Sequence, residues 1–172
     1  MQILANKIGP ITEPDVVIIM GGPGAGKTTR AKIFAEAGYA RLNRDNLGGK
    51  LRDLIPAMDE LYQNGSRRFV LDNTYPLRSS RALVIAWAAS KRISCRCIYV
   101  DTDIEQCKRN NRKRMYQQYG RILSADEIKN MKHPNAAPLV AFGSYRSQLE
   151  RPNPNEGFKE IEIVHFGRFP PS

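Results

Sequence analysis

Cysteine is scarce in this sequence: Cys95, Cys97 and Cys107 are the only three among its 172 residues. The number is odd and no two cysteines are spaced as C-x-x-C, so neither a disulfide framework nor a redox pair of that type is expected. Cys95 and Cys97 fall in an apparent strand, where they are most simply core or surface filler in a reducing compartment. We therefore expect an intracellular protein, cytoplasmic, or nuclear if the source is eukaryotic.

Long hydrophobic runs are also missing. No apolar stretch approaches the roughly 18 residues of a membrane span, and the first residues lack the pattern of a signal peptide. There is no internal repeat, low-complexity tract or interdomain linker. These absences predict a single domain over residues 1–172 with no membrane association, in which residues 1–15 form an N-terminal arm.

Acidic residues are in the minority. The chain has 17 Asp and Glu against 27 Lys and Arg, which leaves a net charge of +10. This excess favours a polyanionic partner, although many basic proteins bind none.

The strongest positive feature is Gly21–Thr28, which fits G-x-x-x-x-G-K-[ST] at every fixed position. The apolar, mostly β-branched run Val16–Met20 in front of it is typical of a buried parallel strand. Thr29–Ala37 has the composition of a helix, with Gly38 where a left-handed helix end favours glycine. A strand before the motif and a helix after it are the context that this phosphate-binding loop requires.

The loop needs these residue types. Glycines let backbone N–H groups approach phosphate oxygens, and the following helix directs its positive end at the same place. Lys27 can reach the β- and γ-phosphates of ATP, and the Thr28 hydroxyl can coordinate Mg²⁺. The residues predicted to bind ATP here are Gly22, Pro23, Gly24, Ala25, Gly26, Lys27, Thr28 and Thr29.

Strands and helices alternate along the chain, which predicts βαβ units and a parallel sheet. The expected strands are 16–20, 39–42, 68–71, 94–100 and 159–164, and the expected helices are 29–37, 47–62, 78–91, 104–115 and 139–149. A capping box at Ser124–Glu127 opens one more short helix. We expect the α/β fold of P-loop NTPases and kinases, with helices flanking the sheet.

Two acids, Asp45 and Asp72, follow predicted strands and should share the rim where the phosphate loop opens. Either could bind Mg²⁺ or its waters, or accept a proton from an attacking hydroxyl. Each could instead cap the helix that follows it.

Residues 108–114 hold five cations and no acid. A solvated helix face normally interleaves acids, so the run indicates a basic lid that binds anions. Arg109 and Arg112 are three residues apart and share one helix face, from which they could stabilise a phosphoryl group in transfer. A plain basic helix is the alternative.

Together these motifs resemble the polynucleotide 5′-hydroxyl kinases, most of all the kinase domain of the mammalian polynucleotide kinase/phosphatase type. The resemblance runs from about Val16 to the C-terminus. It is carried by four segments in the same order and at similar intervals, which are Gly22–Thr28, Asn43–Asp45, Asp72–Thr74 and Asn110–Arg112.

The resemblance implies transfer of the γ-phosphoryl group of ATP to the 5′-hydroxyl of DNA or RNA, with Mg²⁺, in nucleic-acid repair. It implies that Asp45 is the general base, that Asp72 orients the hydroxyl, and that Arg112 and by position Arg109 clamp the donor phosphates. Arg81 matches a family arginine of unassigned role. Tyr75 replaces a family asparagine and could stack on a base or fill space.

Two other functions remain open on the sequence. One is a small-metabolite or nucleoside kinase on the same fold. The other is a nucleotide-gated nucleic-acid-binding module, although a binding module would not need the base Asp45. The sequence does not decide between DNA and RNA or between ATP and GTP, and it is silent on oligomeric state.

Overall fold

The computed structural model describes residues 13–132 and 134–165. The predicted N-terminal arm therefore lies outside the described residues up to residue 12, and its last residue, Asp15, belongs to the first strand. Among the described residues no helix is both long and apolar enough to cross a bilayer.

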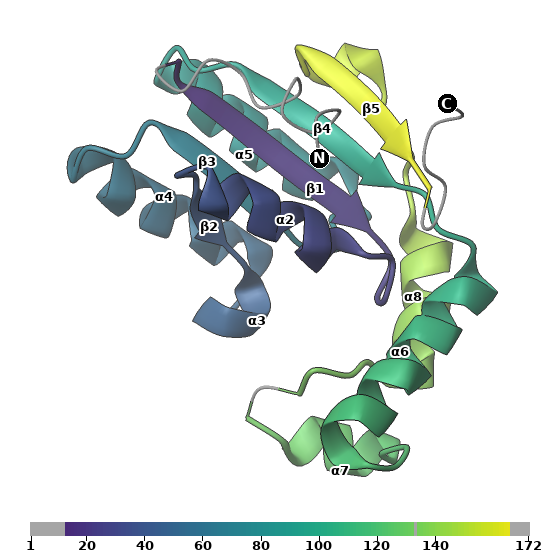
Figure 1. Ribbon diagram of the computed structural model, residues 1–172. Coiled ribbons are helices and arrows are strands. Elements are labelled where there is room, and N and C mark those ends of the chain that lie inside the picture. The colour runs from purple at the N-terminus through teal and green to yellow at the C-terminus, as the bar shows by residue number, and fades with distance from the viewer. Residues whose placement is uncertain (1–12, 133, 166–172) are drawn as a thin grey trace.

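The centre of the fold is a sheet of five parallel strands in the order β2-β3-β1-β4-β5 (Figure 1). The strands are β1 (Asp15–Gly21), β2 (Ala40–Leu42), β3 (Arg68–Asp72), β4 (Cys95–Val100) and β5 (Glu160–Val164). Val16–Met20 of β1 is fully buried, because neighbouring strands and helices cover both of its edges and faces. The predicted parallel α/β sheet is confirmed.

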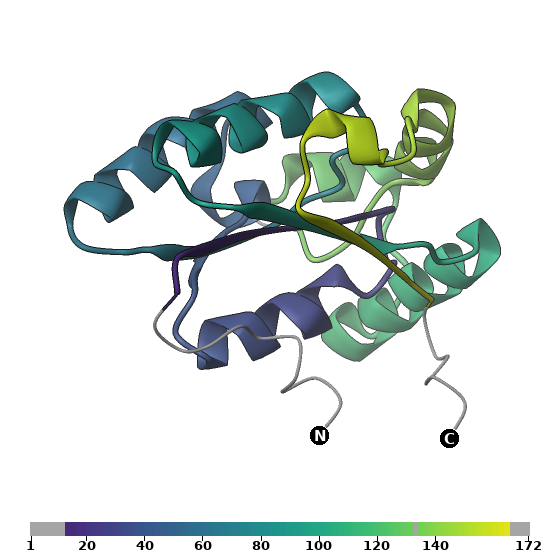
Figure 2. The same ribbon diagram turned by 90° about the horizontal axis from the view of Figure 1, so that it is seen from above.

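Helices cover both faces of this sheet (Figure 2). They are α2 (Lys27–Glu36), α3 (Arg44–Leu47), α4 (Leu54–Gln63), α5 (Arg78–Ser90), α6 (Ile104–Tyr119), α7 (Ala125–Asn130) and α8 (Leu139–Gln148), with single 3₁₀ turns at Leu51–Asp53 and Pro154–Glu156. One core lies between the sheet and α4 and α5, and it includes Met58 and Trp87. The other contains Phe34 of α2, Cys107 of α6 and Phe142 of α8.

One predicted helix is wrong. Residues 47–62 were expected to form a single helix, but the structure divides them into α3, a 3₁₀ turn and α4. Gly48 and Gly49 separate the first two elements with φ angles of +78° and +77°. The helical spacing of leucines on either side is real, but the left-handed backbone of these glycines interrupts the hydrogen-bond ladder.

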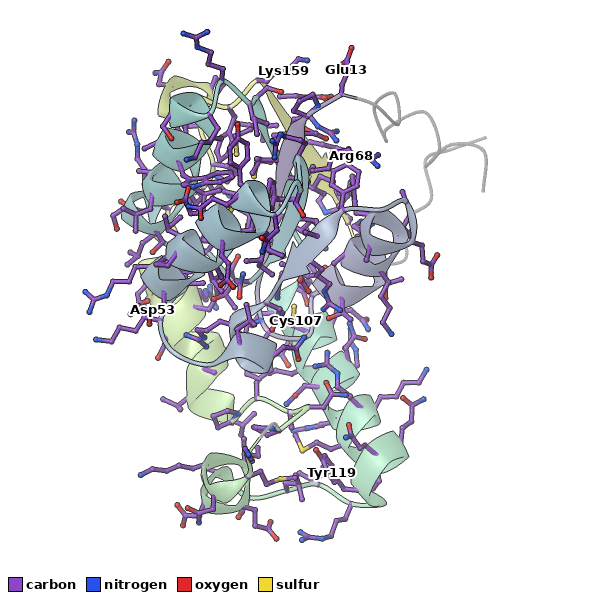
Figure 3. The ribbon with its side chains drawn as sticks, turned by 90° about the vertical axis from the view of Figure 1, so that its left-hand side faces the viewer. Glu13, Asp53, Arg68, Cys107, Tyr119 and Lys159 are labelled. Carbon is purple, nitrogen blue, oxygen red and sulfur yellow. The ribbon has the colours of Figure 1, made fainter. Side chains whose placement is uncertain are left out.

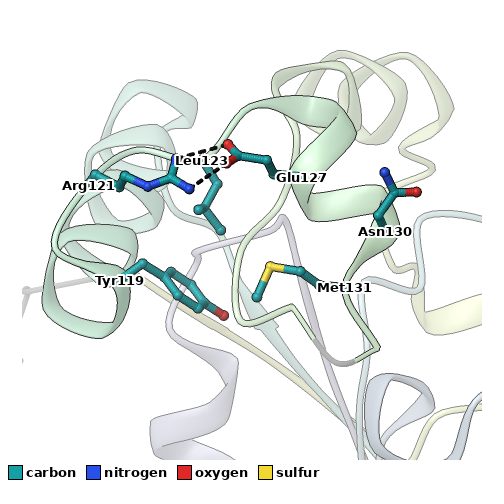
Figure 4. Close-up of a pocket in the computed structure, with 6 residues that line it drawn as sticks. All are labelled: Tyr119, Arg121, Leu123, Glu127, Asn130 and Met131. Carbon is teal, nitrogen blue, oxygen red and sulfur yellow. Dashed lines mark hydrogen bonds and ion pairs between the residues drawn. The ribbon is translucent and has the colours of Figure 1, made fainter.

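A lid, which we define as residues 104–130, extends from the sheet (Figure 1). It consists of α6, which continues to Tyr119 rather than ending near Met115, and α7, which begins with the predicted capping box. Met115, Leu123 and Ile128 form a small core of its own. A hollow of about 390 Å³ lies there, edged by an ion pair of Arg121 with Glu127 (Figure 4).

The sheet has two chemically different ends. Figure 3 shows Arg68 and Lys159 at the end where strands begin, and Cys107 toward the end where they finish. The phosphate loop, Asp45 and Asp72 all follow or terminate strands at the second end. Ligands of parallel α/β sheets bind at this end, so the fold brings the predicted site residues to one rim.

Candidate active site

The phosphate loop, Gly21–Thr28, joins β1 to α2 and is held against α6. The Nδ2 of Asn110 donates to the carbonyl oxygen of Gly24 at 2.8 Å. A Cβ at Gly24 would lie 2.5 Å from the backbone oxygen of Cys107, and the φ angle of Gly24 is +73°. Glycine is required at this position because the left-handed backbone and the approach of α6 both exclude a side chain.

Lys27 begins α2, and its Nζ donates to the carbonyl oxygen of Gly22 at 2.7 Å. Burial lowers the pKa of Lys27 to about 8, and the charge of Asp72 opposes part of this shift. The N-cap residue Gly26 supplies no capping side chain, so no side chain occupies the N–H groups of the first helical turn. A cation beside uncapped amides fits a phosphate group.

The rest of the loop fits ATP and Mg²⁺ equally well. Gly22, Gly24 and Ala25 are buried, Pro23 and Gly26 are half-buried, and Thr28 and Thr29 are exposed. The described ranges contain no cluster of three His, Cys, Asp or Glu suited to a metal. The Thr28 hydroxyl is an oxygen ligand of the kind that Mg²⁺ accepts, and its role as such stays a prediction.

Asp72 ends β3 with its side chain only 1% exposed, in a fork-to-fork ion pair with Arg41 of β2. The Arg41 Nε and Nη2 atoms donate to the two carboxylate oxygens at 2.9 and 2.7 Å. This hydrogen bonding raises the pKa of Arg41. Helix α5 begins with Leu77 as its N-cap, so the capping role considered for Asp72 is wrong.

Asp45 lies in the first turn of α3, with a side chain that is 76% exposed. Asn43, rather than Asp45, is the N-cap: its Oδ1 accepts from the Asp45 N–H at 2.8 Å. Burial lowers the pKa of Lys27 and of Arg114, and the negative charge of Asp45 offsets part of each shift. Asp45 follows β2 at the end of the sheet where the phosphate loop lies, and its exposure leaves the carboxylate accessible to a second substrate.

Two bonds tie α3 to the turn that follows β3. The Asn43 Nδ2 donates to the carbonyl oxygen of Asp72 at 2.7 Å. The Arg44 N–H donates to the Oδ1 of Asn73 at 2.8 Å. The positions of Asp45 and Asp72 are thus coupled.

Arg114 of the lid shares a face of α6 with Asn110, which is four residues earlier and bonds the phosphate loop. Burial lowers its pKa, and its positive charge in turn lowers that of Lys27. Its Nη1 also donates to the Oδ1 of Asn135 at 3.3 Å. Residues two apart on a helix lie about 200° from one another, so Arg112 is turned away from the face that carries Asn110 and Arg114.

Arg109 lies on the same outer side as Arg112. Both side chains are exposed, and the Arg109 Nη2 donates to Gln106 Oε1 at 3.0 Å. The role implied for these two arginines at the donor phosphates stays a prediction.

The residues that sequence reasoning missed are Arg41 and Arg114. The available signal for Arg41 was a charged residue within a short strand that was expected to belong to the parallel sheet. For Arg114 the signal was its spacing of four from Asn110. Tyr75 is fully buried in the core, so it fills space and does not stack on a base at the rim.

Residues 16–138 match the family described as AAA domain. The chain belongs to the AAA domain family.

This AAA domain is 31% identical over 153 residues to the bifunctional polynucleotide phosphatase/kinase of Schizosaccharomyces pombe. That match covers 88% of the chain but only 34% of the relative's length.

Two solved structures show the same fold. A sugar kinase from Janibacter sp. HTCC2649 aligns with a TM-score of 0.61 at 17% identity, over 89% of this chain and 85% of that one. A fungal RNA kinase aligns with a TM-score of 0.56 at 15% identity, over 94% and 79%. These likenesses confirm the P-loop kinase fold.

Proposed function

We propose that this AAA domain is a polynucleotide 5′-hydroxyl kinase, which transfers the γ-phosphoryl group of ATP to the 5′-hydroxyl of DNA or RNA and acts in nucleic-acid repair. The observation that carries the proposal is the exposed Asp45 carboxylate, which follows β2 at the end of the sheet where the phosphate loop lies and is fixed there by the bonds of Asn43 and Arg44 to the turn after β3. The 31% identity to a polynucleotide phosphatase/kinase supports it, as does the resemblance of the four motifs.

In this mechanism the loop amides and Lys27 hold the phosphates of ATP, and Arg114 offsets charge that develops on the γ-phosphoryl group. Asp45 accepts the proton of the 5′-hydroxyl as that oxygen bonds to phosphorus and the bond to ADP breaks. Asp72, buried and paired with Arg41, acts from behind: it anchors the turn after β3 to which α3 is bonded, and so helps hold Asp45 in line with the hydroxyl. Thr28 would hold Mg²⁺ in part, and the ion would supply neutralisation of charge on the phosphate oxygens.

The test is a direct assay of the acceptor. The protein would be incubated with γ-labelled ATP and 5′-hydroxyl oligonucleotides of DNA and RNA, in parallel with free nucleosides and a simple sugar. Lys27→Ala is the control for contaminating kinases, because it removes the phosphate-loop cation.

We expect label on the oligonucleotides only. Label confined to nucleosides or sugar would instead identify a small-molecule kinase. ATP-dependent binding of the oligonucleotide without any transfer would identify a nucleotide-gated binding module.

A further inference from the structure

Arg81, in the first turn of α5, is the largest fully buried side chain among the described residues. It forms a fork-to-fork ion pair with Glu156, in which Nε donates to Oε2 at 2.8 Å and Nη2 donates to Oε1 at 2.6 Å. The two side chains are 0% and 2% exposed. They are 75 residues apart in the sequence, so the pair depends entirely on the tertiary fold.

Stability alone does not account for this pair. Removing two charges from water costs about as much as their attraction returns, and apolar residues of similar size are often as stable or more so. The Arg81 Nη1 atom, which is not one of the two donors to Glu156, indicates that Arg81 also holds the backbone. Its Nη1 donates to the backbone oxygens of Tyr75 at 2.9 Å and Pro76 at 3.3 Å.

The backbone that Arg81 holds is strained. Tyr75 has a φ angle of +44°, in a region that bulky side chains rarely adopt, and it is 0% exposed. Such a conformation persists only where its surroundings impose it. Arg81 supplies one such constraint, because its guanidinium is held by Glu156 and contacts two carbonyl oxygens of this backbone.

The turn at Asp72–Pro76 also organises the candidate active site. Its first residue carries the buried carboxylate paired with Arg41. Its second, Asn73, accepts from the Arg44 N–H next to Asp45, and its own N–H donates to the Ile19 carbonyl of β1 at 3.3 Å. Movement of this turn would therefore displace both acids relative to the phosphate loop.

We propose that Arg81, locked by Glu156, is a positioning residue that fixes the Asp72–Pro76 turn and through it the two acids. The kinetic consequence rests on the proposed function, since it requires phosphoryl transfer to a hydroxyl aligned by Asp45 and Asp72. The fixing of the Asp72–Pro76 turn by Arg81 does not depend on the proposed function.

The kinetic test replaces the pair by apolar residues, Arg81→Met with Glu156→Met. Its control is Asp15→Met with Arg96→Met, because these residues form an ion pair of low exposure, 10% and 13%, where the strands begin, at the opposite end of the sheet. We expect kcat in the Arg81/Glu156 variant to fall about 10- to 100-fold below that of the control variant, since small misplacements of reacting groups cost this much. The KM for ATP should stay within about twofold.

Equal kcat values in two folded double variants would overturn the proposal. Thermal unfolding of both variants shows whether they are folded and comparably stable.

A second measurement does not depend on the acceptor or on the double variant folding. Arg81→Lys keeps a charge against Glu156 but lacks the planar fork that reaches both the carboxylate and the two carbonyls. Hydrogen exchange followed by NMR should show the Arg44 and Asn73 amides exchanging about tenfold or more faster in this variant. Amides of β4 beside Asp15 serve as the internal reference.

Unchanged exchange at Arg44 and Asn73 would overturn the positioning role even if the protein is a kinase. Faster exchange in a protein that labels no oligonucleotide would support the positioning role while the proposed function fails.

Discussion

A substitution at Asp45 tests its proposed role as the general base. Its effect would not reflect loss of a helix cap, because Asn43 caps α3. Asp45→Asn keeps the shape of the side chain and removes its negative charge and its capacity to take a proton. We expect phosphoryl transfer to fall roughly 10²–10⁴-fold, with ATP affinity and melting temperature unchanged. Steady-state kinetics with an oligonucleotide acceptor measures the effect.

The matched control is Asp126→Asn, an exposed acid in the first turn of the short helix α7, outside the site. Near-normal transfer by Asp45→Asn would leave the base unidentified.

Lys27 should make ATP binding depend on pH. Its pKa in the free protein is about 8, against an ordinary value of 10.5. As the pH rises from about 7 to about 9 the ammonium loses its proton, so affinity for ATP should fall. Titration calorimetry across this range measures the trend. Lys27→Arg keeps its charge and should bind ATP with much weaker pH dependence; an equally steep dependence in that variant would exclude Lys27 as the cause.

The same group affects folding in the opposite direction. In the unfolded chain the lysine keeps its proton up to about 10.5, whereas the folded protein releases it near pH 8. The unfolded state therefore binds more protons between these values. The contribution of Lys27 to the free energy of unfolding rises with pH across that window.

Arg114 and Arg112 are distinguished by their side of α6. Arg114 shares the α6 face of Asn110, which bonds the phosphate loop, whereas Arg112 is exposed on the other side. Arg114→Ala should lower kcat by about 10²-fold, and Arg112→Ala should lower it much less. Kinetics at saturating ATP compares the two variants. The reverse order would return the donor-phosphate role to Arg112, as the family resemblance implies.

The contact between the phosphate loop and the lid can be tested through Gly24. A methyl group there would meet the Cys107 backbone at 2.5 Å, so Gly24→Ala should unfold part of the loop and abolish measurable ATP binding. Gly143→Ala is the control because Gly143 lies inside α8 with open space around its Cβ position. That change should stabilise the protein by about 0.5–1 kcal/mol. Thermal unfolding and ATP titration report both effects.

For the chain as a whole, the net charge of +10 has a measurable consequence if the acceptor is a polynucleotide. Each phosphate contact of a single strand adds about 0.7 to the slope of log K against log salt concentration. We expect a negative slope of several units for a 5′-hydroxyl oligonucleotide in the absence of ATP. A free nucleoside provides the control, since it has no phosphates to release counterions. A flat dependence for the oligonucleotide would favour the small-metabolite kinase.

The sequence by itself predicted the structural features that depend on residues adjacent in the chain. The phosphate loop, the strand before it and the helix after it form one continuous segment, and its glycines and β-branched residues impose their own backbone conformations. The parallel sheet followed from the alternation of strands and helices, and the shared rim of Asp45 and Asp72 followed from the parallel sheet. The helix interruption at Gly48–Gly49 was missed because the leucine spacing continued on either side of it.

The tertiary structure decided how the site is assembled. Asp72 pairs with Arg41, 31 residues away, and Arg81 pairs with Glu156, 75 residues away. It also placed the face of α6 that carries Asn110 and Arg114 against the phosphate loop and enclosed Tyr75 in the core. None of these follows from local pattern, because spacing along a helix shows which residues share a face but not which face meets the sheet. That choice depends on how distant segments pack together and on the cost of leaving a buried charge unpaired.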